Sequence, residues 1–472
     1  MSGLDYLFHP RSIAIVGASA NPEKRGHAYL SQLLAFGYPG KLYPVNSKGG
    51  SILGLPAYPS IKAIPGEVDY VVSVVPAAEL PTVIGECAQK GVKVLQLFTA
   101  HLGEAGKAEM EQRIVEQARR AGIRLLGPNC MGVYSPRERI TFRFGWNGLP
   151  GPVSFISQSA GHTAEVVYQA QVRGLGFSKV VSYGNAADIT ETELLSYLAQ
   201  DPETGLIAAY IEGVRDSQHF PTALREAAEH KPVIVLKVGR TPAGARATRS
   251  HTASLSGSDS VFGAVVRQAG AIRADTIEEM VDLMVAFHFL PPPEGRNVAA
   301  IGAGGGGSVL VSDECEAQGL SLPPLPPEVE SQVKDLLKDH WGLIKNPVDT
   351  SVVFPAGYDF GQLRLIFQSM ATHPTYHMLV GDAGEWWLDE PDDLSLHRSL
   401  VDTYIQVMGE SPKPGAVIVR HADCPEEWRW RASMDAIARC AQARLPTFPT
   451  IRRAATALSR FASYHLDNSP TP

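Results

Sequence analysis

Short apolar runs, each followed by a turn of small residues and a helix-like segment, recur along this chain and limit what it can fold into. The first run, Ser12–Val16, reads Ser-Ile-Ala-Ile-Val and stops at Gly17. Continuous apolar runs of this length are typical of parallel strands that are covered on both faces. Similar apolar runs follow at 41–45, 70–75, 92–97 and 124–126. Helix-like segments lie between them at 77–91 and 104–122. The alternation predicts an α/β fold with a doubly wound parallel sheet.

The same alternation continues through the rest of the chain. A length of 472 residues is enough for about three domains of ordinary size. The run Pro-Pro-Pro-Glu-Gly at 291–295 is typical of a linker. We therefore expect three α/β domains, at 1–148, 149–291 and 296–472. The strands expected in the last two domains lie at 152–156, 178–182, 207–211, 233–238, 297–301, 376–380, 416–419 and 446–448.

Composition excludes several classes of protein. The net charge of −7 gives no indication of a nucleic-acid-binding surface. No apolar run reaches the roughly 18 residues needed to span a membrane, and the N-terminus has no secretory pattern. The five cysteines stand singly, with no metal-type spacing. We expect a cytoplasmic protein with reduced thiols and no metal site.

The turn after the first run is a candidate phosphate cradle. Gly17-Ala18-Ser19 follows the strand, and Gly26 opens a helix, so turn amides and a helix N-terminus should face a phosphate. The pattern is not G-x-G-x-x-G, and the next strand leads to Lys48 rather than to the acidic residue that holds a ribose in NAD enzymes. Lys48 favours an extra phosphate, as in coenzyme A. The alternative is that Lys48 is an ordinary surface lysine.

Other residues of the first domain follow strand ends, where ligands bind in open α/β sheets. Val75-Pro76, Phe98 and Asn129 stand at such positions. Cys130 follows Asn129, but no histidine is near it in sequence, and the flanking proline and glycine indicate a shaped turn rather than a nucleophile.

The second domain repeats the pattern. Ser159-Ala160-Gly161 precedes a helix, which is the arrangement of a phosphate site, although Ser159 and Ser157 could simply cap that helix. His162 is interpreted as polar lining. Asn185 and Glu212 follow the next two strands, and parallel strands place their carboxyl ends at one edge of the sheet.

The segment 240–259 contains His251, with Ser250 and Thr252 beside it and three arginines before it. Its small and polar residues bury little apolar surface, so we expect a loop. Imidazole is a nucleophile near neutral pH, and arginines can hold the charge of a phosphoryl group. Glu212 could orient the ring. The alternative is a solvated loop that contains one histidine.

Over essentially its whole length, the chain resembles the α subunit of NDP-forming acyl-CoA synthetases, in the ADP-forming acetyl-CoA synthetase branch of the succinyl-CoA synthetase superfamily. The segment Ser250-His251-Thr252, with Gly-Arg-Thr before it and Gly-Ser-Asp after it, is the most specific match. The chain departs from the family pattern at Ala253, where glycine is usual, and at Ser47, where proline is common. The other matching segments are 15–19, 43–48, 127–130, 157–161, 184–185, 210–213 and 346–349. The resemblance implies that the first of the three domains is Rossmann-like and that the other two are flavodoxin-like.

The resemblance implies roles for the candidate residues. His251 matches the transiently phosphorylated histidine, Glu212 the glutamate that orients it, and Ser159–Gly161 the helix N-terminus that holds the phosphate. Asn185 is grouped with this phosphate site. The residues expected at the CoA site are Gly17, Ala18, Ser19, Lys48, Val75, Pro76, Phe98 and Asn129.

The resemblance also implies a partner. The glycine-rich turn at 302–308 alone would indicate a nucleotide site, but in the family a similar turn packs near the phosphorylation site. No ATP-grasp domain can be placed in the sequence, so ATP or ADP and Mg²⁺ are expected on a separate β subunit of a hetero-oligomer. The tryptophans at 386–387 and 428–430 are a candidate partner surface, or core packing.

The function that follows is a reversible, ADP-forming acyl-CoA synthetase acting through an acyl phosphate and a phosphohistidine. The acyl group is left open. Two other classes remain at this point: a catalytically inactive CoA-binding regulatory or scaffold protein, and a nicotinamide oxidoreductase. The missing ribose carboxylate argues against the last.

Overall fold

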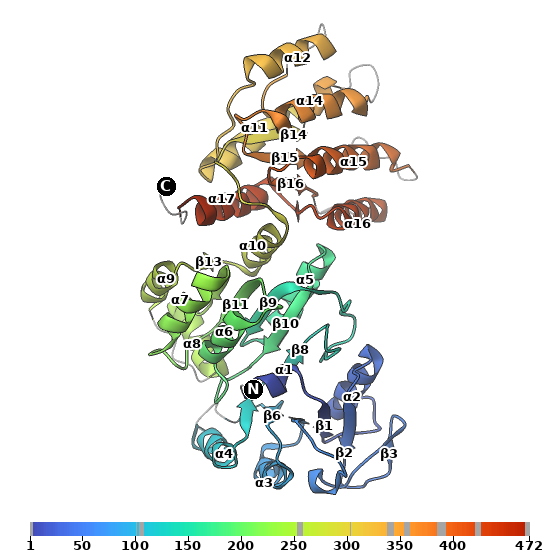
Figure 1. The fold of residues 1–472 in the computed structure, drawn as a ribbon, viewed down its shortest axis with the longest axis vertical. Coiled ribbons are helices and arrows are strands. Elements are labelled where there is room, and N and C mark those ends of the chain that lie inside the picture. The colour runs from blue at the N-terminus through green and yellow to red at the C-terminus, as the bar shows by residue number, and fades with distance from the viewer. Residues whose placement is uncertain are drawn as a thin grey trace. The chain divides into compact units, whose positions relative to one another are not determined.

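The computed structural model describes residues 3–100, 102, 108–252, 258–302, 304–337, 344–353, 359–384, 393–420 and 426–467, with side chains except at 108, 249–252, 337, 352 and 353. These residues divide into two compact units, Met1–Gln171 with Leu175–Met280, and Val172–Gly174 with Val281–Pro472. The first unit contains two main sheets, one parallel and one parallel except for an edge strand, together with a two-stranded antiparallel hairpin at 51–56, and the second unit contains one parallel sheet (Figure 1).

The first sheet has the strand order β2-β1-β5-β6-β7, with all neighbours parallel. All five residues of β1 are buried, as the apolar run predicts. The strands are β1 (Ser12–Val16), β2 (Lys41–Val45), β5 (Tyr70–Ser73), β6 (Val94–Leu97) and β7 (Arg124–Leu126), and the longer helices are α2 (Arg25–Phe36), α3 (Leu80–Lys90) and α4 (Ala108–Arg120). Shorter elements are α1 (Asp5–Phe8), β3 (Ser51–Ile52), β4 (Leu55–Pro56), η1 (Ile61–Ala63) and η2 (Ala77–Glu79).

The second sheet has the order β13-β12-β11-β9-β10-β8, in which only β8 is antiparallel to its neighbour. Helices α6, α7 and α9 pack together beside it. The strands are β8 (Gly132–Tyr134), β9 (Pro150–Ser157), β10 (Phe177–Ser182), β11 (Leu206–Ile211), β12 (Val233–Lys237) and β13 (Ile272–Ala274). The helices are α5 (Ala160–Val172), α6 (Glu191–Gln200), α7 (Phe220–His230), α8 (Pro242–Thr252) and α9 (Asp259–Gln268).

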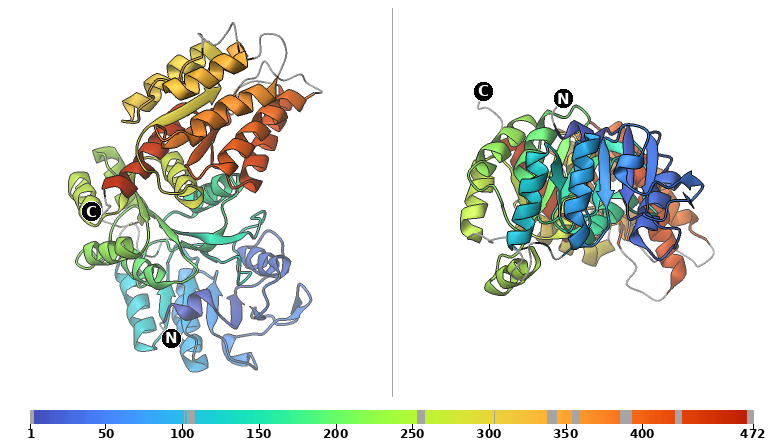
Figure 2. Two further views of the ribbon diagram at one scale, coloured as in Figure 1. Left: turned by 45° about the horizontal axis from the view of Figure 1, so that its top comes forward. Right: turned by 90° about the horizontal axis from the view of Figure 1, so that it is seen from below.

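The second unit holds the sheet β14-β15-β16-β17, which has helices on both faces (Figures 1 and 2). Its core gathers residues from the strands and from α12, α14, α15 and α16. The strands are β14 (Val298–Gly302), β15 (Met378–Asp382), β16 (Gly415–Ile418) and β17 (Thr447–Phe448). The helices are α10 (Ile277–Phe289), α11 (Gly304–Ala317), α12 (Pro327–Leu337), α13 (Thr350–Val353), α14 (Phe360–Thr372), α15 (Ser395–Glu410), α16 (Glu427–Gln442) and α17 (Ile451–Asp467).

All three sheets follow one winding rule. In the first two, the strand that starts the domain lies inside the sheet, the next parallel strand pairs on one side of it, and the third pairs on the other side. In the third, the bridge from Ile301 to Val348 takes the place of the second strand. This is the flavodoxin-like order 2-1-3-4-5, in which ligands bind at the carboxyl ends of the strands where the order reverses. The switch points are β1/β5, β9/β11 and β14/β15, and the α/β prediction is confirmed.

One local prediction is wrong. The segment 240–259 was expected to be a loop, yet α8 occupies Pro242–Thr252 and includes His251 in its last turn. Proline is favoured in the first turn of a helix, and alanine and arginine are strong helix formers. The hydroxyl of Thr241 also accepts a hydrogen bond from the amide of Gly244 at 3.1 Å, which caps the helix. Ala253 lies outside the described residues.

Candidate functional site

The first switch point is built around two glycines. Gly17 has φ +90°, and a Cβ there would lie 3.0 Å from Val74 Cγ2 and 3.2 Å from Val75 Cγ1. A Cβ on Gly26 would lie 2.0 Å from the carbonyl oxygen of Gly17. Glycine at both positions lets the first turn of α2 pack directly on the turn that follows β1.

The amides of this turn differ from expectation. Gly17 N and Ala18 N both donate to the carbonyl oxygen of Val45 at 3.1 Å, so these two groups are not available to a phosphate. The backbone pairing with β2 continues past the end of β1 into the turn. Asn46 then joins the two strand ends, because its Nδ2 donates to Ala18 O at 2.7 Å and its Oδ1 accepts from Lys48 N at 2.9 Å. Lys48 is exposed beside the turn.

Arg25 is a candidate that the sequence reasoning missed. It is the first residue of α2, it is exposed, and its guanidinium lies 5.5 Å from the centre of the Phe98 ring. The helix dipole disfavours a cation at a helix N-terminus. An arginine at the start of this helix was therefore a sequence signal that could have indicated a binding residue. His27 also reaches this turn, with Nδ1 3.1 Å from Ser19 O.

The remaining expected residues of the first domain lie at neighbouring strand ends. The hydroxyl of Thr99 donates to Val75 O at 2.8 Å, and the exposed Pro76 leads into η2. Asn129 has φ +58°, and its amide donates to Thr99 O at 3.0 Å. Cys130 is only 1% exposed, and burial raises the pKa of its thiol well above the ordinary range. A buried thiol of this kind is a poor nucleophile.

The turn that carries Asn129 also joins the two domains of the first unit. Asn185 N donates to Pro128 O at 3.0 Å. A Cβ on Gly184 would lie 2.2 Å from Pro128 O and 2.5 Å from Asn129 O. Glycine at position 184 therefore allows the strand end of the second sheet to contact the turn of the first.

At the second switch point, the hydroxyls at the start of α5 act within the helix cap. Ser159 N donates to Ser157 Oγ at 3.1 Å, and His162 N donates to Ser159 Oγ at 3.4 Å. Capping, the alternative interpretation of these serines, is therefore observed. Ala160 is partly exposed, Gly161 is exposed, and a Cβ on Gly161 would meet nothing within 4 Å. There is open space at this helix N-terminus.

Asn185 is fully buried at the end of β10. Its Nδ2 donates to Glu111 Oε2 at 3.2 Å, and its carbonyl oxygen accepts from Arg215 Nε at 3.0 Å. The side-chain donor predicted to face a phosphate is thus used to hold α4. Within the described residues its Oδ1 has no hydrogen-bond partner.

Glu212 follows β11 and is 6% exposed. Its backbone is held by two buried side chains that the sequence reasoning did not assign, Gln158 and Lys237. Lys237 is 2% exposed, and burial lowers the pKa of its ammonium group. Only the strand-end spacing, with Gln158 directly after β9 and Lys237 closing β12, could have indicated them.

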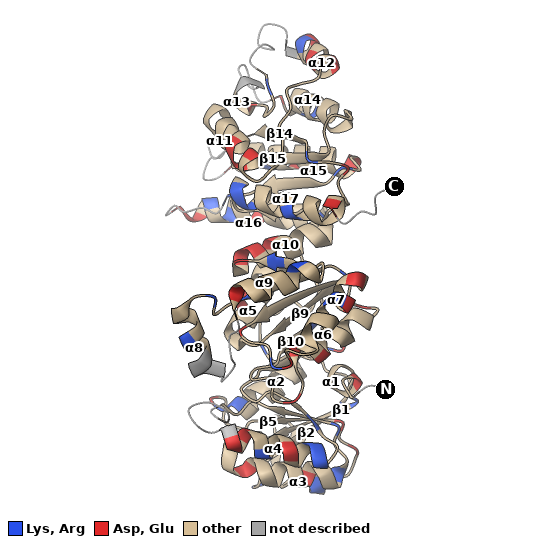
Figure 3. Ribbon diagram, turned by 90° about the vertical axis from the view of Figure 1, so that its left-hand side faces the viewer, with Lys and Arg blue, Asp and Glu red and all other residues tan. Residues whose placement is uncertain are grey.

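His251 lies on the helix that follows β12, and its side chain is outside the described set. β11 and β12 are parallel neighbours, with Ile211 paired to Lys237, so Glu212 and α8 follow adjacent strand ends. The charged residues of α8 are arginines, and the helix is basic (Figure 3). Since β9 to β12 are parallel, the features at Gly161, Asn185, Glu212 and α8 all follow carboxyl ends at one edge of the sheet.

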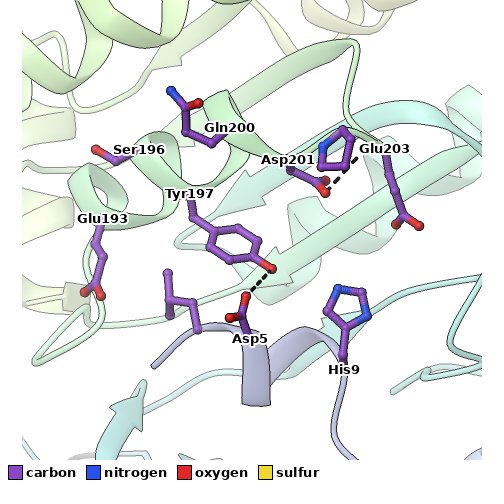
Figure 4. Close-up of a pocket in the computed structure, with 10 residues that line it drawn as sticks. Asp5, His9, Glu193, Ser196, Tyr197, Gln200, Asp201 and Glu203 are labelled. Atoms are coloured by element: carbon purple, nitrogen blue, oxygen red, sulfur yellow. Dashed lines mark hydrogen bonds between the residues drawn. The ribbon is translucent and has the colours of Figure 1, made fainter. Parts of the chain in front are cut away.

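A cavity of about 710 Å³ lies elsewhere in the first unit, between α1 and the carboxyl end of α6 (Figure 4). Tyr197 points towards Asp5, and its hydroxyl donates to Asp5 Oδ1 at 3.2 Å. Lys179 donates to Asp201 and Glu203 at 2.8 Å each. These carboxylates are engaged by the chain itself, so the cavity contributes nothing to the edge that carries Glu212.

Other features can be stated for the described part of the chain. None of its helices is long and apolar enough to cross a membrane, and no group of three His, Cys, Asp or Glu side chains in it could hold a metal ion. Four cysteines, at 87, 130, 315 and 440, are free and buried. Trp430 is 47% exposed on α16, beside the Arg429–Trp428 contact, whereas 386–387 lie outside the described residues.

The fold is that of a doubly wound α/β protein whose candidate residues lie at the switch points of its sheets. Two family models match, one described as a CoA binding domain over residues 11–136 and one as a succinyl-CoA ligase like flavodoxin domain over residues 150–287. The first model covers the first sheet and β8, and the second model covers strands β9 to β13 of the second sheet.

Relatives of known name extend the match to the whole chain. The α subunit of acetate–CoA ligase (ADP-forming) I from Pyrococcus furiosus is 38% identical over 97% of this chain and 96% of its own. An ADP-forming acetate–CoA ligase from Methanocaldococcus jannaschii is 38% identical over 73% of this chain and 49% of its own. A solved dinucleotide forming acetyl-coenzyme A synthetase 1 from Ca. Korarchaeum cryptofilum, in complex with phosphate and ADP, matches with a TM-score of 0.83 and 29% identity over 100% of both chains. The chain belongs to the family of ADP-forming acetate–CoA ligase α subunits.

Proposed function

We propose that this chain is the α subunit of an ADP-forming acyl-CoA synthetase, which interconverts a carboxylate, CoA and ATP with acyl-CoA, ADP and phosphate. In the ATP-forming direction, phosphate displaces CoA from the acyl-CoA and leaves an acyl phosphate. A ring nitrogen of His251 then takes the phosphoryl group and releases the carboxylate. ADP takes the phosphoryl group from His251 and becomes ATP, and each step is reversible.

One observation carries the proposal: Glu212 and the helix bearing His251 follow adjacent parallel strands at the switch-point edge. A carboxylate that accepts a hydrogen bond from one ring nitrogen fixes the tautomer in which the other is nucleophilic. The open N-terminus of α5 supports the role of Ser159–Gly161 as the phosphate site, because a helix N-terminus stabilises phosphate charge.

CoA is assigned to the first switch point. Gly17–Ser19, Val75, Pro76, Phe98 and Asn129 would surround it there. The exposed cations Lys48 and Arg25 support recognition of its phosphates, since both flank the turn after β1. We keep the domain limits 1–148, 149–291 and 296–472 as part of this proposal.

The nucleotide is assigned to a partner chain with an ATP-grasp domain, which would bring ATP or ADP with Mg²⁺. The relative from P. furiosus that matches over 97% of this chain is named an α subunit. That name supports a hetero-oligomer in which this chain has a partner subunit. His251 must then move between two sites, and we assign that motion to the segment after β12.

The test is phosphorylation of the purified full chain by radiolabelled acetyl phosphate, followed by acid treatment and peptide mapping. The expected result is an acid-labile phosphate on His251 that the His251→Ala variant lacks. His230→Ala is the matched control, because His230 is exposed at the end of α7, with Nδ1 2.7 Å from Glu226 O, and it should label normally.

A label that persists in His251→Ala would overturn the role of that residue. If CoA binds but no phosphate is taken up, even with an ATP-grasp partner present, the chain is a CoA-binding scaffold and the synthetase proposal fails.

A further inference from the structure

Gln158 makes an unusual set of contacts across the second switch point. It lies between the end of β9 and the start of α5 and is 2% exposed. Its Oε1 accepts hydrogen bonds from the amides of Glu212 and Gly213, the second at 2.9 Å. Its Nε2 donates to Gly213 O at 3.0 Å. Both ends of one carboxamide are therefore used on one dipeptide.

The sheet itself cannot supply these bonds. The last pair between β11 and β9 joins Tyr210 to Ser157, so Glu212 and Gly213 lie beyond the ladder. Buried backbone groups without hydrogen-bond partners destabilise the fold, so side chains must replace the missing strand. Gln158 satisfies the groups that face β9.

Two more buried side chains complete the support of this turn. Lys237 Nζ donates to Glu212 O at 2.9 Å from the β12 side. Glu191, at the start of α6, accepts from Arg215 N at 2.7 Å. The backbone of residues 212–215 is thus held by side chains from three different parts of the domain.

We infer that Gln158 is a positioning residue for the phosphoryl-transfer step: it fixes the backbone of Glu212 and so the direction from which that carboxylate meets the histidine-bearing segment. This inference rests on the proposed function, because it gives Gln158 a purpose only if Glu212 orients His251. An amide is required, since a carboxylate cannot donate to Gly213 O and an aliphatic side chain can neither donate nor accept.

The experiment compares the wild-type chain with Gln158→Leu, Gln158→Glu and a matched control, Ser154→Ala. Ser154 lies on β9, the strand that ends directly before Gln158, and is fully buried; its hydroxyl donates to Leu206 O at 3.3 Å at the other end of β11. Each protein is tested for its melting temperature, for CoA binding, and for its rate of labelling by acetyl phosphate as a function of pH.

We expect Gln158→Leu to label about 10- to 100-fold more slowly, because small misplacements of a catalytic group have effects of this size. CoA binding should stay unchanged, and Ser154→Ala should label at the wild-type rate. Gln158→Glu keeps the acceptor oxygens but adds a negative charge. Because a nearby negative charge favours the protonated form of neighbouring groups, the acid limb of the pH–rate profile should move to higher pH. This second variant decides the question if Gln158→Leu does not fold.

The inference is overturned if the folded Gln158 variants label at the wild-type rate with the wild-type pH profile. A purely structural role would give that result together with lower melting temperatures. Failure of the wild-type chain to label is a different outcome, which overturns the proposed function and the inference with it.

Discussion

Arg124 and Glu193 form a two-pronged ion pair, with Arg124 Nη1 and Nη2 each 2.7 Å from a carboxylate oxygen of Glu193. Arg124 opens β7 in the first sheet, and Glu193 lies in the first turn of α6 beside the second sheet. Hydrogen bonding to Glu193 is the largest cause that raises the pKa of Arg124 above its ordinary value. With the Pro128–Asn185 hydrogen bond, this pair holds the two domains of the first unit together.

Replacing Glu193 by Gln should weaken this connection. Both side chains are about one third exposed, so the loss should be modest, about 1 kcal/mol in the free energy of unfolding measured with urea. Glu116→Gln is the control, because Glu116 makes an exposed pair with Arg120 within α4 and should change stability by less than about 0.5 kcal/mol. Equal losses in the two variants would contradict a specific role for the Arg124 pair.

The glycine contact at the first switch point gives a second prediction. In Gly26→Ala the new Cβ would collide with Gly17 O, so the turn must move and CoA affinity should fall at least about tenfold, or about 1.4 kcal/mol. Gly85→Ala is the matched control within α3, where a Cβ meets nothing within 4 Å. That change should stabilise the helix by up to about 1 kcal/mol and leave CoA binding unchanged. Calorimetric titration measures the CoA affinity of both variants. An unaltered affinity in Gly26→Ala would refute the assigned site.

A substitution of Lys48 tests which phosphate of CoA the first domain binds. If Lys48 binds the ribose phosphate of CoA, Lys48→Ala should weaken CoA binding by about tenfold and hardly change the binding of dephospho-CoA. Lys93→Ala removes another exposed lysine of the same domain and should affect neither ligand. Equal weakening of CoA and dephospho-CoA would assign Lys48 to another part of the ligand, and no weakening would make it an ordinary surface lysine.

Features that depend on neighbouring residues could be predicted from the sequence, whereas contacts between residues far apart in the sequence could not. β1, β2 and β7 begin and end where their apolar runs do, because burial on both faces leaves a continuous local signal. The position of Glu212 and the histidine segment after neighbouring strands could also be predicted, since parallel strands share an edge. The contact of Asn185 with Glu111 could not be predicted, because the two residues are 74 positions apart and no local pattern indicates such a contact.

Other differences arose where one local signal outweighed another. The segment around His251 has few apolar residues, which indicated a loop, but its alanines and the Thr241 cap favour the helix that is observed. Glycines at the first turn were interpreted as a phosphate cradle, whereas the amides of Gly17 and Ala18 pair with Val45. The role of Gln158 could not be predicted, because a glutamine can donate and accept hydrogen bonds almost anywhere and the sequence does not show its partners.

His288 in α10 provides a pH-dependent prediction for the second unit. Burial, aided by the charge of Arg444, lowers the pKa of His288 from 6.5 to about 4. Above pH 6.5 the ring is neutral in both the folded and the unfolded chain, so it adds no pH dependence. As the pH falls from 6.5 towards 4, the unfolded chain binds a proton that the folded chain excludes, and stability declines.

Between pH 7 and pH 5 this one group should lower the free energy of unfolding by about 2 kcal/mol, with partial exposure reducing the effect. A His288→Gln variant removes the titration, so its urea midpoint should fall less than that of the wild type over this interval. Between pH 7 and pH 9 the two proteins should run in parallel, which is the internal control. If both lose the same stability from pH 7 to pH 5, the His288 ring is protonated in the folded unit, and its burial beside Phe289 and Arg444 does not keep it neutral.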